Sequence, residues 1–424
     1  MKALFLSYDG LTDPLGGSQI LPYVCGLARK GHSLTVISFE KPERLFKGRE
    51  EVARTLESAG VRWIPFRYTK RPPVLSTVFD LLKLTLTASW LASMNQIEIV
   101  HARSYVPALA GNFVSRLCGA AFVFDMRGFW ADERVEGGLW DLRRTHYRAI
   151  YRFFKRRETN FLNRAHAVVS LTENGLREME GWKGIFRLRE KTTVIPCSVD
   201  LQHFDPSRFT SAQRGQVRAR LGLGGHELLC GYSGSLGTWY RPEPMLRLFA
   251  RIRESNSGAK FLFLTPDSRE SVLAIAAQLG VPESALVVLH ATRDEMPAYL
   301  HCLDVGISFI EPCYSKKSSS ATKVGEFLAM GVPVIANSGI GDQDLLLGGG
   351  GGGFVIQDFS EDSLRAAAGA LAGLRARSSL AIRRLAEREL SLERANDSYD
   401  AIYRASGTKS RAGFLNRRDG RART

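Results

Sequence analysis

Short apolar runs alternate along most of the chain with longer segments whose apolar residues recur at the helical period, as in 20–29. Continuous apolar runs are typical of strands that helices cover on both faces, and alternation with helices predicts βαβ units and parallel sheets. The predicted strands are 3–7, 34–39, 61–66, 97–101, 121–125, 167–171 and 193–196 in the first half, and 228–233, 260–264, 285–289, 305–309, 333–336 and 354–356 in the second.

The same pattern in both halves of a chain of 424 residues predicts an α/β protein with two Rossmann-like, doubly wound domains. Ligands of such sheets bind beyond the carboxyl ends of the strands, so we expect the site in a cleft between the domains. The predicted parts are an N-terminal domain 1–204, a linker with a short helix 205–225, a C-terminal domain 226–382, a helix 383–405 that returns to the N-terminal domain, and a basic, disordered tail 406–424.

Composition and cysteine usage indicate in which compartment the protein is found. With 44% hydrophobic and 24% charged residues, the chain has the make-up of a globular protein with a real core. Its six cysteines are scattered, without a CxxC pair, which indicates reduced thiols in a cytoplasmic protein. The first ten residues are too weakly apolar for a signal peptide. The most apolar stretch, 74–92, contains Asp80 and Lys83, so it predicts a partly buried helix rather than a membrane span.

The net charge of +15 fits three kinds of partner: nucleic acid, an anionic membrane surface, or acidic substrates such as nucleoside diphosphates. Part of it lies in 143–164, which holds eight Lys or Arg and one Glu. Such a helix can lie on an anionic membrane, or pack its apolar stripe on the sheet and leave its charges in water. Both interpretations stand, and they are compatible. The apolar stripe consists of Tyr147, Ile150, Tyr151, Phe154 and Phe161.

Gly16 and Gly17 follow the first strand and precede a helix predicted to open at Ser18. Two glycines let backbone amides approach a ligand, and a helix N-terminus favours an anion. A plain tight turn is the alternative. The GxGxxG fingerprint of dinucleotide-binding enzymes is not present here.

Residues 322–336 read as a helix start, two helical turns, a glycine stop and a buried strand. Lys323 and Glu326 are three residues apart and share a helix face. A lysine beside free helix amides suits a diphosphate, and a carboxylate one turn later can accept hydrogen bonds from two ribose hydroxyls. The alternative is an ion pair between the two side chains on the surface.

This pattern resembles the nucleotide-sugar site of family-four retaining glycosyltransferases, which have the GT-B fold. The resemblance continues at 194–204, 231–236 and 337–342 and covers nearly the whole chain to about residue 405. It implies that Glu326 holds the ribose, that Thr322 and Lys323 hold the diphosphate, and that Gly16 and Gly17 approach the phosphate or the donor sugar from the other domain.

The chain departs from this family at three donor-site positions. The first of the family's two glutamates falls at Ser318, and the arginine that commonly follows Gly234 is Ser235. Arg241 stands in for the usual lysine a few residues later. At these three positions the donor contacts of the family are missing or replaced, whereas Glu326 keeps the ribose contact that the resemblance implies.

The acceptor is expected in the N-terminal half. Asp125 and Arg127 come at the carboxyl end of a strand, before a loop rich in charged and aromatic residues. The family often has a histidine near this loop; His101 is the nearest one here, with a structural role as the alternative. Asp342-Gln343-Asp344 imitates a metal-binding DxD motif, but the resembled fold is metal-independent, so these residues are interpreted as an ordinary loop.

The resulting hypothesis is a cytoplasmic enzyme, at the inner face of the membrane, that transfers a sugar from a nucleoside-diphosphate sugar to a glycan or lipid-linked acceptor with retention. The resemblance implies that no metal or other cofactor is needed. Cationic and amide donors would then stabilise the leaving diphosphate. One rival is a nucleotide-sugar epimerase, although the eight histidines show no acid/base cluster. Another is a non-catalytic, nucleic-acid-binding protein with a degenerate donor site, although the basic residues follow no known RNA-binding module, so no specific nucleic acid is expected.

Overall fold

The computed structural model describes residues 1–224 and 227–421, which form two compact units. The first joins Met1–Pro196 to the C-terminal segment that begins at Leu392, and the second is Cys197–Ser391. Each unit is built on a parallel sheet with helices on both faces. The predicted fold class, two Rossmann-like α/β domains, is confirmed.

In the described part of the first unit, the sheet has seven parallel strands in the order β3-β2-β1-β4-β5-β6-β7. The order reverses between β1 and β4, and a reversal of this kind marks the ligand-binding edge of a doubly wound sheet. The strands are β1 Lys2–Ser7, β2 Ser33–Glu40, β3 Arg62–Arg67, β4 Ile99–Arg103, β5 Ala121–Asp125, β6 Ala167–Ser170 and β7 Thr192–Val194.

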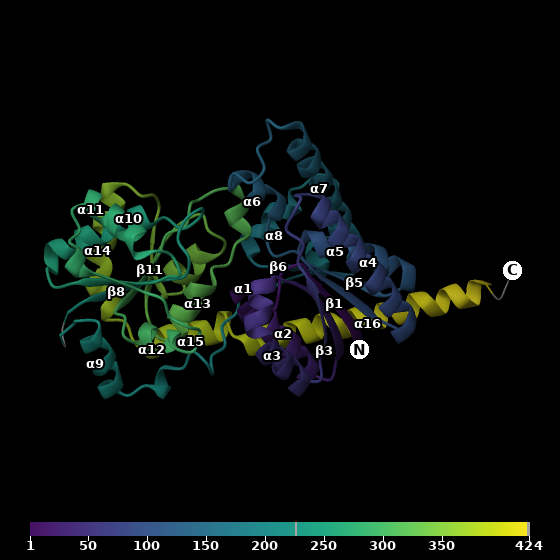
Figure 1. Ribbon diagram of the computed structural model, residues 1–424, viewed down its shortest axis with the longest axis horizontal. Coiled ribbons are helices and arrows are strands. Elements are labelled where there is room, and N and C mark those ends of the chain that lie inside the picture. The colour runs from purple at the N-terminus through teal and green to yellow at the C-terminus, as the bar shows by residue number, and fades with distance from the viewer. Residues whose placement is uncertain (225–226, 422–424) are drawn as a thin grey trace. The chain divides into compact units, whose positions relative to one another are not determined.

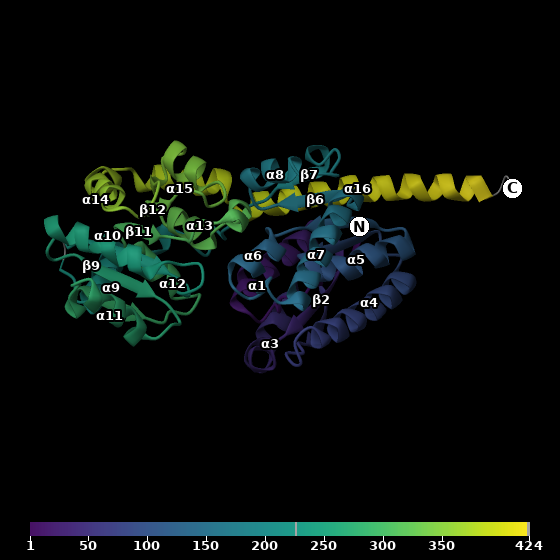
Figure 2. The same cartoon turned by 90° about the horizontal axis from the view of Figure 1, so that it is seen from above.

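The crossover helices α4, α5 and α7 pack on one face of this sheet and α2 and α3 on the other, where α16 packs against α2. Helices α4 and α5 lie side by side in both views (Figures 1 and 2). The helices are α1 Pro14–Gln19, α2 Leu21–Arg29, α3 Pro42–Ser58, α4 Leu75–Asn95, α5 Tyr105–Cys118, α6 Trp130–Glu136, α7 Thr145–Arg164, α8 Glu173–Glu180 and α16 Leu392–Arg421.

The second unit has, in its described residues, six parallel strands in the order β10-β9-β8-β11-β12-β13. They are β8 Leu229–Ser233, β9 Lys260–Leu264, β10 Leu286–Leu289, β11 Val305–Ser308, β12 Val334–Asn337 and β13 Gly353–Ile356. The helices are α9 Ser211–Arg220, α10 Pro242–Ser255, α11 Arg269–Gln278, α12 Met296–His301, α13 Thr322–Ala329, α14 Glu361–Arg375 and α15 Ser379–Glu389.

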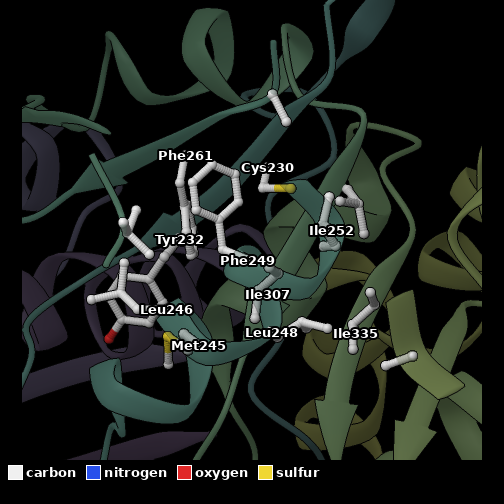
Figure 3. Packing of buried hydrophobic residues seen from close by; sticks show 14 of the residues in the cluster. Cys230, Tyr232, Met245, Leu246, Leu248, Phe249, Ile252, Phe261, Ile307 and Ile335 are labelled. Atoms are coloured by element: carbon white, nitrogen blue, oxygen red, sulfur yellow. The ribbon is translucent and has the colours of Figure 1, made fainter. Parts of the chain in front are cut away.

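Aromatic and aliphatic side chains of β8, β9 and α10 form one core layer of the second unit (Figure 3). Tyr232 lies among Phe249, Phe261 and Met245, with its hydroxyl at the edge of the cluster (Figure 3). Every predicted strand of both halves is present in the structure, with ends that differ by at most two residues.

The units divide at other residues than the sequence predicts. Residues 197–204 belong to the second unit, because Val199 and Phe204 are buried in its core. The predicted linker, whose last residue lies outside the described range, contains α9 and belongs to the same unit. There the buried Arg218 donates a hydrogen bond of 2.9 Å to the carbonyl of Cys302. The segment predicted to be a free linker is therefore packed into the second unit by its buried side chains.

The chain returns to the first unit at Leu392 rather than at 383, because α15 packs within the second unit. Helix α16 then continues to Arg421, through most of the segment predicted to be a disordered tail; residues 422–424 of that prediction lie outside the described residues. A helix that is already nucleated extends at little cost. Among the described helices none is long and apolar enough to cross a membrane.

Candidate functional site

The glycine pair lies inside α1, not before it. The helix begins at Pro14, whose fixed φ suits a first helical position, so the predicted start at Ser18 is wrong. A Cβ on Gly16 would lie 1.9 Å from the carbonyl oxygen of Gly10, whereas a Cβ on Gly17 would meet nothing closer than 3.9 Å. Gly16 is therefore required by the packing of α1 on the preceding loop, whereas Gly17 has room for a methyl group.

Sequence reasoning missed the buried Glu40, which shapes this loop from the end of β2. Its carboxylate accepts hydrogen bonds from the backbone amides of Leu11, at 2.8 Å, and Thr12, at 3.0 Å, and from the hydroxyl of Ser38, at 2.5 Å. A Cβ on Gly10 would lie 2.6 Å from the same carboxylate. A glutamate that ends an apolar strand is the only sequence signal of this role.

The structure brings the predicted Asp125, Arg127 and His101 together at the carboxyl ends of β4 and β5. Oδ2 of Asp125 lies 3.5 Å from Nε2 of His101 and 3.5 Å from the guanidinium of Arg103, and Oδ1 lies 3.9 Å from that of Arg127. Helix α16 completes this buried cluster: Tyr399 donates to Asp125 at 3.1 Å, and the Tyr403 hydroxyl lies 2.9 Å from Nδ1 of His101. The tyrosines were missed because they are distant in sequence.

Burial alone would raise the pKa of Asp125, but Arg127, His101 and Arg103 lower it to about 2. Burial lowers the pKa of His101, so a carboxylate faces a neutral imidazole. The space beside this cluster is too narrow for a water molecule. Arg127 is the member nearest the surface; it has a φ of 55°, a strained value for a residue other than glycine, and its guanidinium lies 3.5 Å from the side-chain oxygen of Gln19 on α1.

In the second unit, Lys323 in the first turn of α13 is buried against two aromatic rings. Its Nζ donates to the hydroxyl of Tyr232 at 2.8 Å and lies 3.3 Å from the ring centre of Tyr240. Burial lowers the pKa of Lys323 well below its ordinary value. Gly234, which follows β8 and has a φ of 109°, leaves room for this amine, because a Cβ there would lie 3.1 Å from Nζ.

Glu326 lies one turn further along α13 and is half-buried. Within the described residues its carboxylate forms no hydrogen bond or ion pair, so the alternative of a Lys323–Glu326 surface pair is not what the structure shows. Burial raises the pKa of Glu326, and the charges of Arg293 and Lys323 oppose that shift. Because the carboxylate has no partner among the described residues, it can accept hydrogen bonds from a ligand.

The remaining donor-site positions lie in neighbouring loops. Arg241, which precedes α10, is half-exposed and forms an ion pair with Glu311. Ser318 is buried and donates to the carbonyl of Ser315 at 2.8 Å, so its hydroxyl faces the turn in which it lies. A cation that the sequence did not indicate, Lys316, places Nζ 3.7 Å from the ring centre of Trp239.

The basic segment 143–164 contains α7, and the residues of its apolar stripe are buried or half-buried. Phe154 and Phe161 are in the core, and Tyr151 donates to Asp132 at 2.7 Å. The packing interpretation is therefore the observed one for the stripe, while the arginines stay exposed. The buried Glu158 lies 2.5 Å from the amine of Lys155, and burial raises its pKa to about 7.

Comparison with known proteins places the fold among known ones. A family model described as Glycosyltransferase Family 4 matches residues 20–203. No curated protein matches the chain by sequence. The structure is similar to a glycosyltransferase from Rickettsia africae ESF-5, with a TM-score of 0.73 and 15% identity over 96% of this chain and 98% of that one.

Two further structures share the fold. Anabaena Alr3699/HepE in complex with UDP and glucose has a TM-score of 0.67 and 14% identity, over 94% of this chain and 98% of that one. WaaG, a glycosyltransferase involved in lipopolysaccharide biosynthesis, has a TM-score of 0.67 and 14% identity, over 95% and 99%. Identities this low establish the fold alone. The structural neighbours thus establish the GT-B fold, and the family model matches less than half of the chain.

Proposed function

We propose that this protein transfers a sugar from a nucleoside-diphosphate sugar to an acceptor hydroxyl, with retention of configuration. The observation that carries the proposal is the carboxylate of Glu326, half-buried and without a hydrogen-bond partner in the described residues, one turn after a buried lysine at the start of α13. Since the first turn of a helix favours anions, this arrangement suits a ribose next to a diphosphate.

In the proposed donor complex, Glu326 accepts hydrogen bonds from the two ribose hydroxyls, and the amides of Thr322 and Lys323 approach the diphosphate. Arg241 adds a second cation. A diphosphate beside Lys323 would favour its charged form and offset the burial that lowers its pKa. Catalysis then comes from cationic and amide donors that stabilise the charge developing on the leaving diphosphate. We infer that no metal ion or other cofactor is needed.

The acceptor side of the proposal uses the first unit. Arg127 and the backbone at Gly17 contact the acceptor or the donor phosphate, while Asp125 and His101, which are fully buried, act as positioning residues for Arg127. A glycan or a lipid-linked acceptor at the inner face of the membrane fits the exposed arginines of α7, which can contact anionic headgroups.

The test is calorimetric binding of UDP, GDP, ADP and their common sugars to the purified protein in EDTA. We expect a preference for one nucleotide. Glu326→Ala should weaken donor binding by roughly 2–4 kcal/mol, because two hydrogen bonds to a charged acceptor are lost. Glu270→Ala, an exposed carboxylate on α11, is the matched control and should leave binding unchanged.

The donor site is contradicted if the folded protein binds none of the nucleotides or sugars, or if Glu326→Ala binds them as tightly as the wild type. Conversion of the sugar to its epimer without transfer would indicate an epimerase. Salt-sensitive binding of random nucleic acid that is tighter than binding of any nucleotide sugar would indicate the nucleic-acid-binding alternative.

A further inference from the structure

Helix α4 is apolar on its outer face as well as on the face that packs against the sheet. Leu84, Ala88 and Leu91 are buried. A helix that is apolar all round is normally buried all round. The outward side chains recur every three or four residues and form one stripe along the helix; they are 48% to 71% exposed, and they are Leu75, Val78, Phe79, Leu82, Leu86, Trp90 and Met94.

The neighbouring helix α5 extends this stripe. Phe113 and Leu117, one helical turn apart, are 54% and 63% exposed, and α5 packs beside α4 (Figure 1). We call the exposed apolar side chains of both helices the α4–α5 face. At about 100 Å² for each half-exposed large side chain, it covers on the order of 900 Å². Most monomeric proteins leave patches of only a few hundred Å² uncovered.

The charges around the α4–α5 face are almost all positive. The acidic residue of α4, Asp80, is fully buried and accepts hydrogen bonds from the Thr69 amide, at 3.0 Å, and the Tyr8 hydroxyl, at 3.1 Å. Three exposed cations, Arg67, Lys70 and Arg71, precede α4 in the sequence. A fourth, Arg116, is exposed on α5. A groove of about 650 Å³ beside the start of α4 is lined by Phe79 and by Lys41, Arg67, Lys70 and Lys83, with Glu43 as its one acidic residue.

We propose that the α4–α5 face docks this protein on an anionic lipid bilayer. The helix lies in the plane of the interface, its apolar stripe enters the boundary between headgroups and acyl chains, and the cations beside its start contact lipid phosphates. A second copy of the chain would set like charges against each other across the same face, whereas anionic lipid complements them. The proposal does not depend on sugar transfer.

The first test is co-sedimentation of the full chain with vesicles of phosphatidylcholine, with and without phosphatidylglycerol. We expect the wild type to bind the anionic vesicles. The double variant Leu86→Ser/Trp90→Ser, in which both side chains already contact water, should keep its circular dichroism spectrum and bind at least about 10-fold more weakly. The matched control is Phe46→Ser on α3, a side chain that is 92% exposed outside the face and should not affect binding.

A second variant separates the electrostatic part. Lys70→Ser/Arg71→Ser should weaken binding to the anionic vesicles about 10- to 30-fold and reduce its salt dependence.

If Leu86→Ser/Trp90→Ser binds the anionic vesicles as strongly as the wild type, the proposal is contradicted. It is also contradicted by loss of binding only in Arg152→Ser/Arg156→Ser, which would assign the contact to α7. A dimer in sedimentation velocity that the double variant abolishes would make a second copy the occupant. Nucleotide binding, measured on the same variants, reports separately on the proposed donor site.

Discussion

At the scale of single residues, the environment of a charge decides its role. Asp125 stands at the carboxyl end of a strand, where an exposed catalytic group is expected, yet it is buried against two arginines and accepts a hydrogen bond from Tyr399. Lys323 and Glu326 are spaced like a surface ion pair, yet the lysine turns to Tyr232 and leaves the carboxylate unpaired within the described residues. Spacing along a helix indicates which residues share a face but not which partner each one chooses.

Asp125→Asn should destabilise the protein by about 3 kcal/mol at pH 7, because two buried guanidinium groups lose their counter-charge. The folded pKa of about 2 is below the ordinary 3.8, so the carboxylate's contribution is full above pH 4 and is lost as the pH falls towards 2. Urea denaturation across this pH range should therefore show the gap between wild type and variant closing in acid. Asp397→Asn, an exposed partner of Lys30, is the control and should change little. A gap that stays constant with pH would contradict an ionised Asp125.

At the scale of elements, the two neighbouring glycines of α1 differ in the space that the packing of the helix leaves for a side chain. Gly16→Ala should cost about 1–3 kcal/mol, because its methyl group collides with backbone that cannot turn away. Gly17→Ala should be neutral or stabilise α1 by about 0.5–1 kcal/mol, since alanine favours the helix and has space. Thermal unfolding of the pair tests this contrast. Equal stabilities would show that α1 does not pack on the Gly10 loop as described.

At the scale of the whole molecule, the chain passes from one unit to the other twice, at Pro196 and at Leu392. The second unit is one continuous segment, so a fragment 197–391 should fold by itself. The first unit should not fold without α16, which supplies four core side chains, namely Ala395, Tyr399, Ile402 and Tyr403. Each large one contributes about 1.5–3 kcal/mol, a sizeable part of a typical stability.

Circular dichroism melts and limited proteolysis of fragments 197–391 and 1–196 test this difference. A cooperative transition is expected for the first fragment only. Addition of a synthetic peptide that begins at residue 392 should restore protease resistance to fragment 1–196. Cooperative folding of that fragment alone would mean that α16 is an accessory to the first unit rather than part of its core.

The sequence by itself determined the strands, their alternation with helices, the two parallel α/β halves and the α13 motif, because periodicity and apolar runs are local properties that each segment carries. Tertiary structure decided where the units divide, that Glu40 organises the loop before α1, and that Tyr399 and Tyr403 cover His101 and Asp125. It also decided that α4 keeps an apolar face in water while the stripe of α7 is buried or half-buried. Burial and partners between distant segments depend on how the elements pack, and no local pattern records that.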